Sequence, residues 1–384
     1  MRTVYLDNSA TTALTSNVRQ AMLAAFDCYG NPSSLHSIGK SAEGMMEEAR
    51  NSILEALSLP TRDYKVIFTS GGTEANNLAL FGTLGAKNYV NPRIIITDSE
   101  HPCILEPAKA LEAKGVEVVR LSTKNGCIDP NELLEAIHSN TVLLSIMHVN
   151  NETGAMYDIA NLFRMAKAKK PDLICHTDAV QAFLKIPFRP DRCSCDLVSI
   201  SSHKIHGPKG AGALVVSKEI LKRRNLAPVL LGGGQEDNFR SGTENTICIA
   251  GFGAAAKEGA AKLRENYTKM NELRQYLIAH LPAEVKANLP PKASCHILNI
   301  TLPDIKSETM LHFLSSKGCF VSSGSACSSH GKKGSYVLRA FGLGDKESDT
   351  SIRISLNAEI SKDDLDYFLL QLNDGLAGLV RMHV

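Results

Sequence analysis

Three side chains that could carry out chemistry come directly after short apolar segments. His101 follows RIIITDSE, Asp178 follows LICHT and Lys204 follows LVSISSH. Burial of a lysine favours its uncharged, nucleophilic form, and a carboxylate beside a buried strand needs a cation or a hydrogen-bond donor. The three residues could therefore form a reactive site, although a lone histidine or lysine is more often a structural or surface residue.

A fourth candidate, Cys327, lies among small residues in the segment SSGSACSS. Structural cysteines usually pack among large apolar side chains, whereas a nucleophilic thiol must be accessible. The surroundings of Cys327 are therefore not those of a core cysteine.

A candidate anion site follows the apolar segment VIFTS. Gly71 and Gly72 allow a tight turn, and a helix is expected from Thr73 onward. Backbone N–H groups at the start of a helix bind anions, phosphate above all. Taken alone, such a pair of glycines is more often only a turn.

Together, an anion site, a histidine, an aspartate and a lysine at strand ends suit pyridoxal 5′-phosphate (PLP). This cofactor needs a lysine for a Schiff base, an acidic partner for its pyridinium nitrogen and a phosphate site. Asp178 would thereby gain the cation that a buried carboxylate requires.

Apolar segments and helical segments alternate between about residues 65 and 217. Continuous rather than alternating apolarity indicates strands buried on both faces, as in a parallel sheet. The sequence therefore predicts an α/β fold with a mostly parallel seven-stranded sheet. The seven expected strands are KVIFTS, RIIITD, VEVVRLS, TVLLSIMHV, LICHTDA, LVSISSHK and GALVVS.

The character of the sequence changes after about Gly251. A long Ala-rich, charged segment with helical character leads into a segment that mixes prolines with a strand-like run, ILNITLP. These features predict a second, smaller α+β domain. Ligands of open α/β sheets bind beyond the carboxyl ends of the strands, which is where the reactive side chains are expected to meet.

The composition is that of an ordinary soluble globular protein. The hydrophobic fraction of 43% and the charged fraction of 21% are ordinary for this class. The net charge of +2 gives no reason to expect a nucleic acid or a membrane as a partner. The ten cysteines are scattered and no export signal is recognisable, so we expect reduced cysteines and a cytoplasmic protein.

Several motifs, in their order along the chain, resemble those of the NifS/IscS-type cysteine desulfurases. This family belongs to the class V aminotransferase group of fold-type I PLP enzymes. The resemblance extends from residue 4 to beyond Arg353. Its motifs are VYLDNSATT, SGGTEANN, SEHP, VNNETG, HTDAVQ, SSHKIHGPKG, RSGTEN and SSGSACSS with SYVLRAFGL.

The resemblance implies a role for each of eleven residues. Lys204 would bind the cofactor as a Schiff base, Asp178 would pair with the ring nitrogen and Gln181 with the ring hydroxyl. His101 would stack on the ring and assist proton transfer. The phosphate would be held by Gly72, Thr73, Ser201 and His203, and by Thr243 of a neighbouring subunit; Asn151 and Arg353 would hold the substrate.

The resemblance also implies the reaction and the organisation of the chain. L-cysteine would be converted to L-alanine, leaving a persulfide on Cys327 for an acceptor protein, either an iron–sulfur scaffold or a tRNA-thiolation enzyme. A homodimer is implied, with a large domain over residues 15–256. A small domain, formed by residues 1–14 and 257–384, would carry the Cys327 loop.

Two alternatives stay open at this point. The first is a selenocysteine or cysteine-sulfinate lyase, which can work without a persulfide cysteine. The second is a catalytically silent interaction protein of the same fold. The basic residues after Cys327, Lys332 and Lys333, can favour a thiolate, meet an acidic acceptor or simply be solvated.

Overall fold

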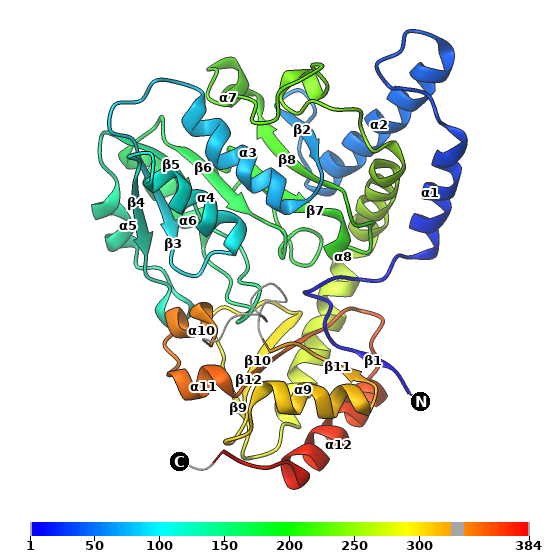
Figure 1. Cartoon of the computed structure of the whole chain (residues 1–384), viewed down its shortest axis with the longest axis vertical. Helices are drawn as coiled ribbons and strands as arrows, with labels where there is room; N and C mark the ends of the chain where they lie inside the picture. Colours follow the sequence, from blue (N-terminus) through cyan, green and yellow to red (C-terminus); the bar gives the residue numbers. More distant parts are fainter. Residues whose placement is uncertain (1, 324–333, 383–384) are drawn as a thin grey trace.

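The structure is a computed structural model that describes residues 2–323 and 334–382. Figure 1 shows a central sheet wrapped by helices above a smaller group of strands and helices. The long helix α8 (Thr246–Ala279) runs from the first group into the second.

The central sheet has seven strands, as the sequence predicts. In the order β2-β8-β7-β6-β5-β3-β4, only β8 runs opposite to the others. The strands are β2 (Tyr64–Thr69), β3 (Arg93–Thr97), β4 (Glu117–Leu121), β5 (Thr141–Ser145), β6 (Ile174–Asp178), β7 (Leu197–Ser201) and β8 (Gly212–Ser217). The predicted α/β fold with a mostly parallel sheet is confirmed.

Helices cover both faces of this sheet, which explains its continuous apolar strands. On one face, α3 (Gly72–Gly85), α4 (Pro102–Glu112) and α7 (Lys218–Lys222) pack on side chains such as Ile94 and Leu143. The other face carries α1 (Ser16–Asp27), α2 (Ser37–Ala56), α5 (Pro130–Ala136), α6 (Ile159–Lys169) and the first part of α8. Neighbouring strand residues such as Ile94 and Ile95 thus point into two different cores.

The smaller group of elements has a core of its own. Strands β9 (Lys286–Ala287), β10 (Ile297–Thr301) and β12 (Ser351–Ser355) form an antiparallel sheet, and β1 (Val4–Tyr5) pairs in parallel with β11 (Cys319–Phe320). Helices α9 (Ser307–Ser316), α10 (Tyr336–Phe341), α11 (Asp345–Asp349) and α12 (Lys362–Gly378) complete it. The domain boundary at residue 256, inside α8, stays a prediction.

Among the described residues, no helix combines the length and the apolarity that crossing a membrane requires.

Candidate active site

A cavity of about 220 Å³ lies at the carboxyl ends of the central strands, where the smaller group of elements meets the sheet. Ten of the twelve predicted site residues line it. They are Gly72, Thr73, His101, Asn151, Asp178, Gln181, Ser201, His203, Lys204 and Arg353. Strand ends bring them together because the parallel strands finish at one edge of the sheet.

Lys204 lies in the short helical turn η2 (Ser202–Lys204) that follows β7. Its Nζ donates to the carbonyl oxygens of Ser9 at 2.5 Å and Ala10 at 2.8 Å. These carbonyls belong to the chain segment after β1, and Thr12 ties the same segment to the His203 carbonyl through its N–H and its hydroxyl. The N-terminal segment therefore positions the lysine at the cavity wall.

Asp178 ends β6 and is buried beneath the cavity. Its Oδ1 accepts the Val180 N–H at 2.9 Å, and its Oδ2 accepts an N–H of Asn76 at 2.7 Å. Among the described residues it has no ion-pair partner. Two donors thus orient a carboxylate that can still receive a cation from the cavity side.

His101 caps the N-terminus of α4, because its Nδ1 accepts the Cys103 N–H at 3.2 Å. Burial lowers the pKa of His101, and Lys204 adds to this lowering, whereas the carboxylate of Asp178 raises the pKa. The net shift is downward, so the imidazole is neutral near pH 7.

The residues expected at the phosphate surround the first turn of α3. A side-chain Cβ on Gly72 would come within 2.8 Å of the Val180 side chain, so only glycine leaves room there. The hydroxyl of Ser201 is buried without a hydrogen-bond partner among the described residues. Burial and the charges of Lys204, Lys209 and Lys185 lower the pKa of His203 to about 4, so its imidazole is a neutral hydrogen-bonding group.

The remaining predicted residues at the cavity are Gln181, Asn151 and Arg353. Gln181 donates to the Ser9 carbonyl at 2.9 Å, and its Oε1 has no partner among the described residues. Arg353 pairs with Asp7 at 2.6 Å and donates to the Asn151 carbonyl at 2.9 Å, while its Nε and the Asn151 Oδ1 have no described partner. Buried polar atoms without partners are rare, so this cavity suits a polar occupant.

The other two predicted residues are Thr243 and Cys327. Thr243 is exposed and does not line the cavity, so its role toward the cofactor of a neighbouring subunit stays a prediction. Cys327 and the expected conformation of its loop lie outside the described residues.

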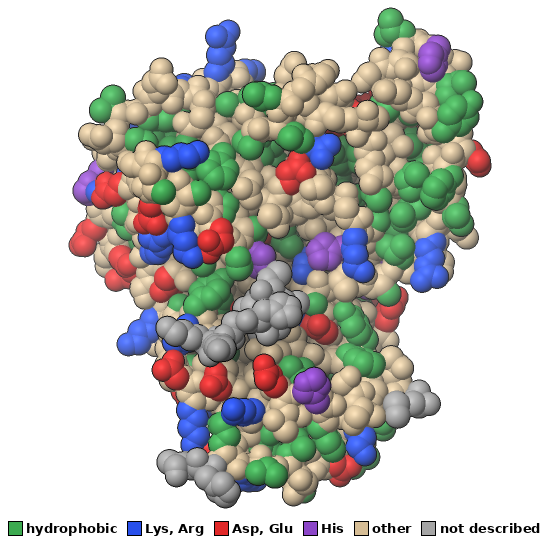
Figure 2. Space-filling view, viewed as in Figure 1, with side chains coloured by type: hydrophobic (Ala, Val, Ile, Leu, Met, Phe, Trp, Pro, Cys, Tyr) green, Lys and Arg blue, Asp and Glu red, His purple; other side chains and the backbone are tan. Residues whose placement is uncertain are grey.

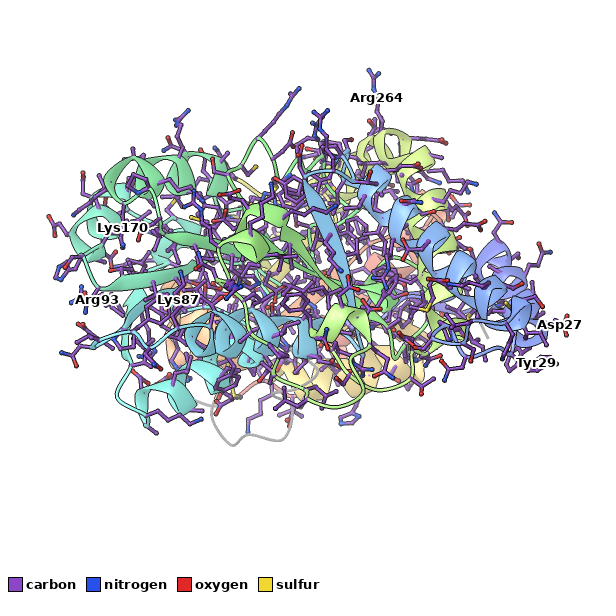
Figure 3. All side chains as sticks on the ribbon, turned by 90° about the horizontal axis from the view of Figure 1, so that it is seen from above. Asp27, Tyr29, Lys87, Arg93, Lys170 and Arg264 are labelled. Atoms are coloured by element: carbon purple, nitrogen blue, oxygen red, sulfur yellow. The ribbon has the colours of Figure 1, made fainter. Side chains whose placement is uncertain are left out.

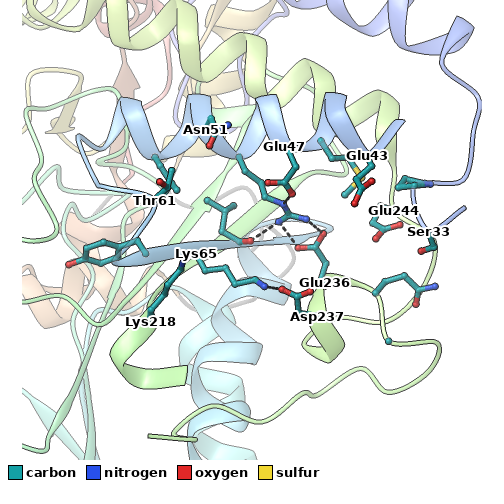
Figure 4. Close-up of a pocket in the computed structure, with 18 residues that line it drawn as sticks. Ser33, Glu43, Glu47, Asn51, Thr61, Lys65, Lys218, Glu236, Asp237 and Glu244 are labelled. Carbon is teal, nitrogen blue, oxygen red and sulfur yellow. Dashed lines mark hydrogen bonds and ion pairs between the residues drawn. The ribbon is translucent and has the colours of Figure 1, made fainter. Parts of the chain in front are cut away.

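A larger hollow of about 480 Å³ lies elsewhere, between α2, β2 and the loop at residues 234–237 (Figure 4). None of the predicted site residues that the structure describes lines it. Two of its cations pair with acidic residues of this loop: Arg50 forms a bidentate ion pair with Glu236, and Lys65 pairs with Asp237. These ion pairs anchor the loop at residues 234–237.

Four residues that contribute polar groups to the site were not predicted from the sequence. Ser9 and Ala10 act through backbone carbonyls, which leave no side-chain signal. Asn76 lies in the GGTEANN motif, where an amide facing an otherwise apolar helix side could have revealed it. Cys103 lines the cavity one residue after Pro102, and nothing in its sequence surroundings marks it.

Lys185 is a buried cation close to this site and has no side-chain hydrogen bond or ion pair among the described residues. Burial lowers its pKa from 10.5 to about 7, with a further lowering from Lys204. The folded protein therefore binds fewer protons here than the unfolded chain between about pH 7 and 10.5, so the residue destabilises the fold increasingly as the pH falls through this range.

We expect Lys185→Met to raise the free energy of unfolding at pH 7 by about 1–3 kcal/mol, because it removes an unpaired buried amine. The gain should shrink as the pH rises toward about 10.5 and vanish above it, where neither state binds the proton. Urea unfolding at both pH values measures this, with Lys209→Met as the exposed control. A variant that is no more stable at pH 7 than the native protein contradicts the prediction.

The comparisons with known proteins agree with this geometry. A family model described as aminotransferase class-V matches residues 4–368. The chain is 38% identical over 374 residues to cysteine desulfurase IscS of Dictyoglomus turgidum, covering 96% of this chain and 93% of that one. A solved NifS-like protein has a TM-score of 0.91 at 32% identity, covering 98% of this chain and 100% of that one. SspA, solved in complex with cysteine, has a TM-score of 0.80 at 31% identity, covering 92% and 99%.

The sheet, the cavity and the matched family model define a member of the aminotransferase class V family, whose enzymes use PLP. Within that family, the chain belongs to the cysteine desulfurases.

Proposed function

We propose that this protein converts L-cysteine to L-alanine and stores the sulfur on Cys327 as a persulfide for an acceptor protein. The observation that supports this most is the single cavity that combines Lys204, Asp178 and His101 with the N-terminus of α3. A structural neighbour named as a complex with cysteine supports the substrate.

The cavity residues fit PLP as the cofactor. Lys204 would hold it covalently, Asp178 would pair with its ring nitrogen and Gln181, through the free Oε1, with its ring hydroxyl. Gly72, Thr73, Ser201 and His203 would hold its phosphate at the first turn of α3. When bound, the cofactor supplies an electron sink for the substrate's α-carbon.

Arg353 and Asn151 would orient the substrate. The guanidinium is buried and lies between Asp7 and the Asn151 carbonyl, with its Nε still free of described partners. A substrate carboxylate would bind this guanidinium and compete with Asp7 for it. This contact fixes the amino acid so that its sulfur can be presented to Cys327.

Absorbance and product analysis of the native protein test the proposal. Purified protein reconstituted with PLP should show a visible absorbance band and should form alanine from cysteine. A protein that stays colourless after reconstitution would favour the silent interaction protein. Alanine formation from selenocysteine or cysteine sulfinate, but not from cysteine, would favour the lyase.

We also propose a homodimer, which would bring Thr243 of one subunit to the other's cofactor. Exposed apolar side chains gather over α1 and the start of α2, where Figure 2 shows an apolar area. They are Leu23, Phe26, Tyr29, Leu35 and Ile38. Tyr29 is 78% exposed at one end of the molecule, opposite the end that carries Arg93 and Lys170 (Figure 3). Such a patch suits a second copy of the chain.

The acceptor would be an iron–sulfur scaffold or a tRNA-thiolation enzyme. Charges of both signs are mixed over the face shown in Figure 2, which gives no support for a nucleic acid as a direct partner. The cytoplasmic location and the absence of a membrane partner stay predictions from the sequence.

A further inference from the structure

A second thiol, Cys103, lies inside the cavity. It is the second residue of α4, it is buried, and it contacts three groups of the site. Its Sγ lies 2.9 Å from the His101 Nδ1, 2.9 Å from the Asn76 Nδ2 and 3.8 Å from the Asp178 Oδ2. None of the roles assigned above uses this thiol.

The hydrogens in this cluster can be assigned from the donors and acceptors present. Asn76 has two N–H bonds on Nδ2; one points to Asp178 and the other to the sulfur of Cys103. The sulfur thus accepts from Asn76, and its own hydrogen must go to His101 or Asp178. The distance to the His101 Nδ1 is the shorter by far, so the S–H donates there.

Cys103 keeps this hydrogen near neutral pH. Burial and the Asp178 carboxylate raise the pKa of the Cys103 thiol well above its usual value, so the thiolate is not formed. Cys103 is therefore a donor in this cavity and not a second nucleophile.

These contacts allow only one tautomer of the neutral His101 imidazole. Its Nδ1 accepts both the Cys103 S–H and the Cys103 backbone N–H, so the single proton of the neutral ring lies on Nε2. The charged or titratable groups that act on this cluster are Asp178, Lys204 and the buried Glu100.

We propose that Cys103 is a positioning residue that keeps His101 neutral with its proton on Nε2, and that Asn76 connects this pair to Asp178. The Asn76 amide thus orients two groups at once. One is Asp178, the proposed partner of the ring nitrogen, and the other is the Cys103 thiol, which determines the tautomer of His101. The significance for catalysis rests on the proposed function, but the hydrogen bonds themselves do not.

Nitrogen NMR of the histidine rings tests the proposal. The protein is labelled with ¹⁵N-histidine and titrated with and without PLP, and His101→Gln identifies the signal of His101 among the 12 histidines. In the native protein, the His101 ring shifts should be those of the Nε2–H form. In Cys103→Ala, the pH at which His101 becomes protonated should rise by about 0.5–1 pH unit, because one donor to Nδ1 is lost.

Two further variants make the result specific. Cys103→Ser keeps a donor at the same position and should restore most of the native titration. Cys175→Ala removes a buried thiol from β6 that does not line the cavity, so it should leave His101 unchanged.

Two outcomes would overturn the proposal. The first is a native His101 in the Nδ1–H form, and the second is a Cys103→Ala titration identical to the native one. If Cys103→Ala does not fold, infrared spectra of the native protein and of Cys103→Ser still test the proposal. The difference between the two spectra gives the Cys103 S–H stretch, and a hydrogen-bonded S–H stretch is shifted from that of a free thiol. The NMR result without PLP does not depend on desulfurase activity. A failure of the proposed function can therefore be distinguished from a failure of the role proposed for Cys103.

Discussion

In the Cys327→Ala variant, we expect sulfur transfer from cysteine to an acceptor to fall by about 1000-fold or more while PLP stays bound. The variant loses the nucleophile that would take the substrate's sulfur, and loss of a nucleophile is among the largest single effects in enzymes. All the described residues that line the cavity proposed for the cofactor are kept in this variant. Persulfide labelling and the visible absorbance band measure the two effects separately.

Cys127→Ala is the matched control for this experiment. Cys127 is exposed and lies after β4, away from the cavity. Its loss should change neither persulfide formation nor absorbance. If Cys327→Ala desulfurates cysteine as fast as the native protein, the persulfide mechanism is wrong and the lyase alternative gains support.

The Lys204→Ala variant should lose both the visible band of the covalently bound cofactor and at least about 1000-fold in alanine formation. The same change removes two hydrogen bonds to the Ser9 and Ala10 carbonyls, so the N-terminal segment loses an anchor. We expect a stability loss of about 1 kcal/mol, because the two bonds are partly buried and the Ser9 carbonyl keeps its bond from Gln181.

Absorbance after reconstitution with PLP, together with urea unfolding, separates these two consequences. Lys209→Ala is the control, because Lys209 is exposed and only five residues further along the same loop. A Lys204→Ala protein that retains the native band would show that another amine holds the cofactor and would overturn the assignment.

Much of the fold can be predicted from the sequence because strands buried on both faces leave continuous apolar runs. The segment RIIITD became β3, and the polar residues that follow such segments reached one cavity, since parallel strands end at one edge. Asp129 and Pro130 likewise marked the start of α5, as capping chemistry predicts.

Other parts of the site could not be predicted, for physical reasons. The Ser9 and Ala10 carbonyls reach Lys204 only because β1 joins the smaller group of elements and leads the chain across the cavity. The partners of Cys103 depend on the turn between β3 and α4 and on how α3 lies against β6. Neither of these packing relations is encoded in the spacing of residues along the chain.

The pairing of β1 with β11 has a consequence for the order in which the protein is made. Val4 leaves the ribosome long before its partner Cys319, because most of the described chain separates the two residues. At about 5–20 residues per second, the first strand waits for tens of seconds. The pairing that leads the Ser9 and Ala10 carbonyls to Lys204 therefore cannot form until Cys319 has been made.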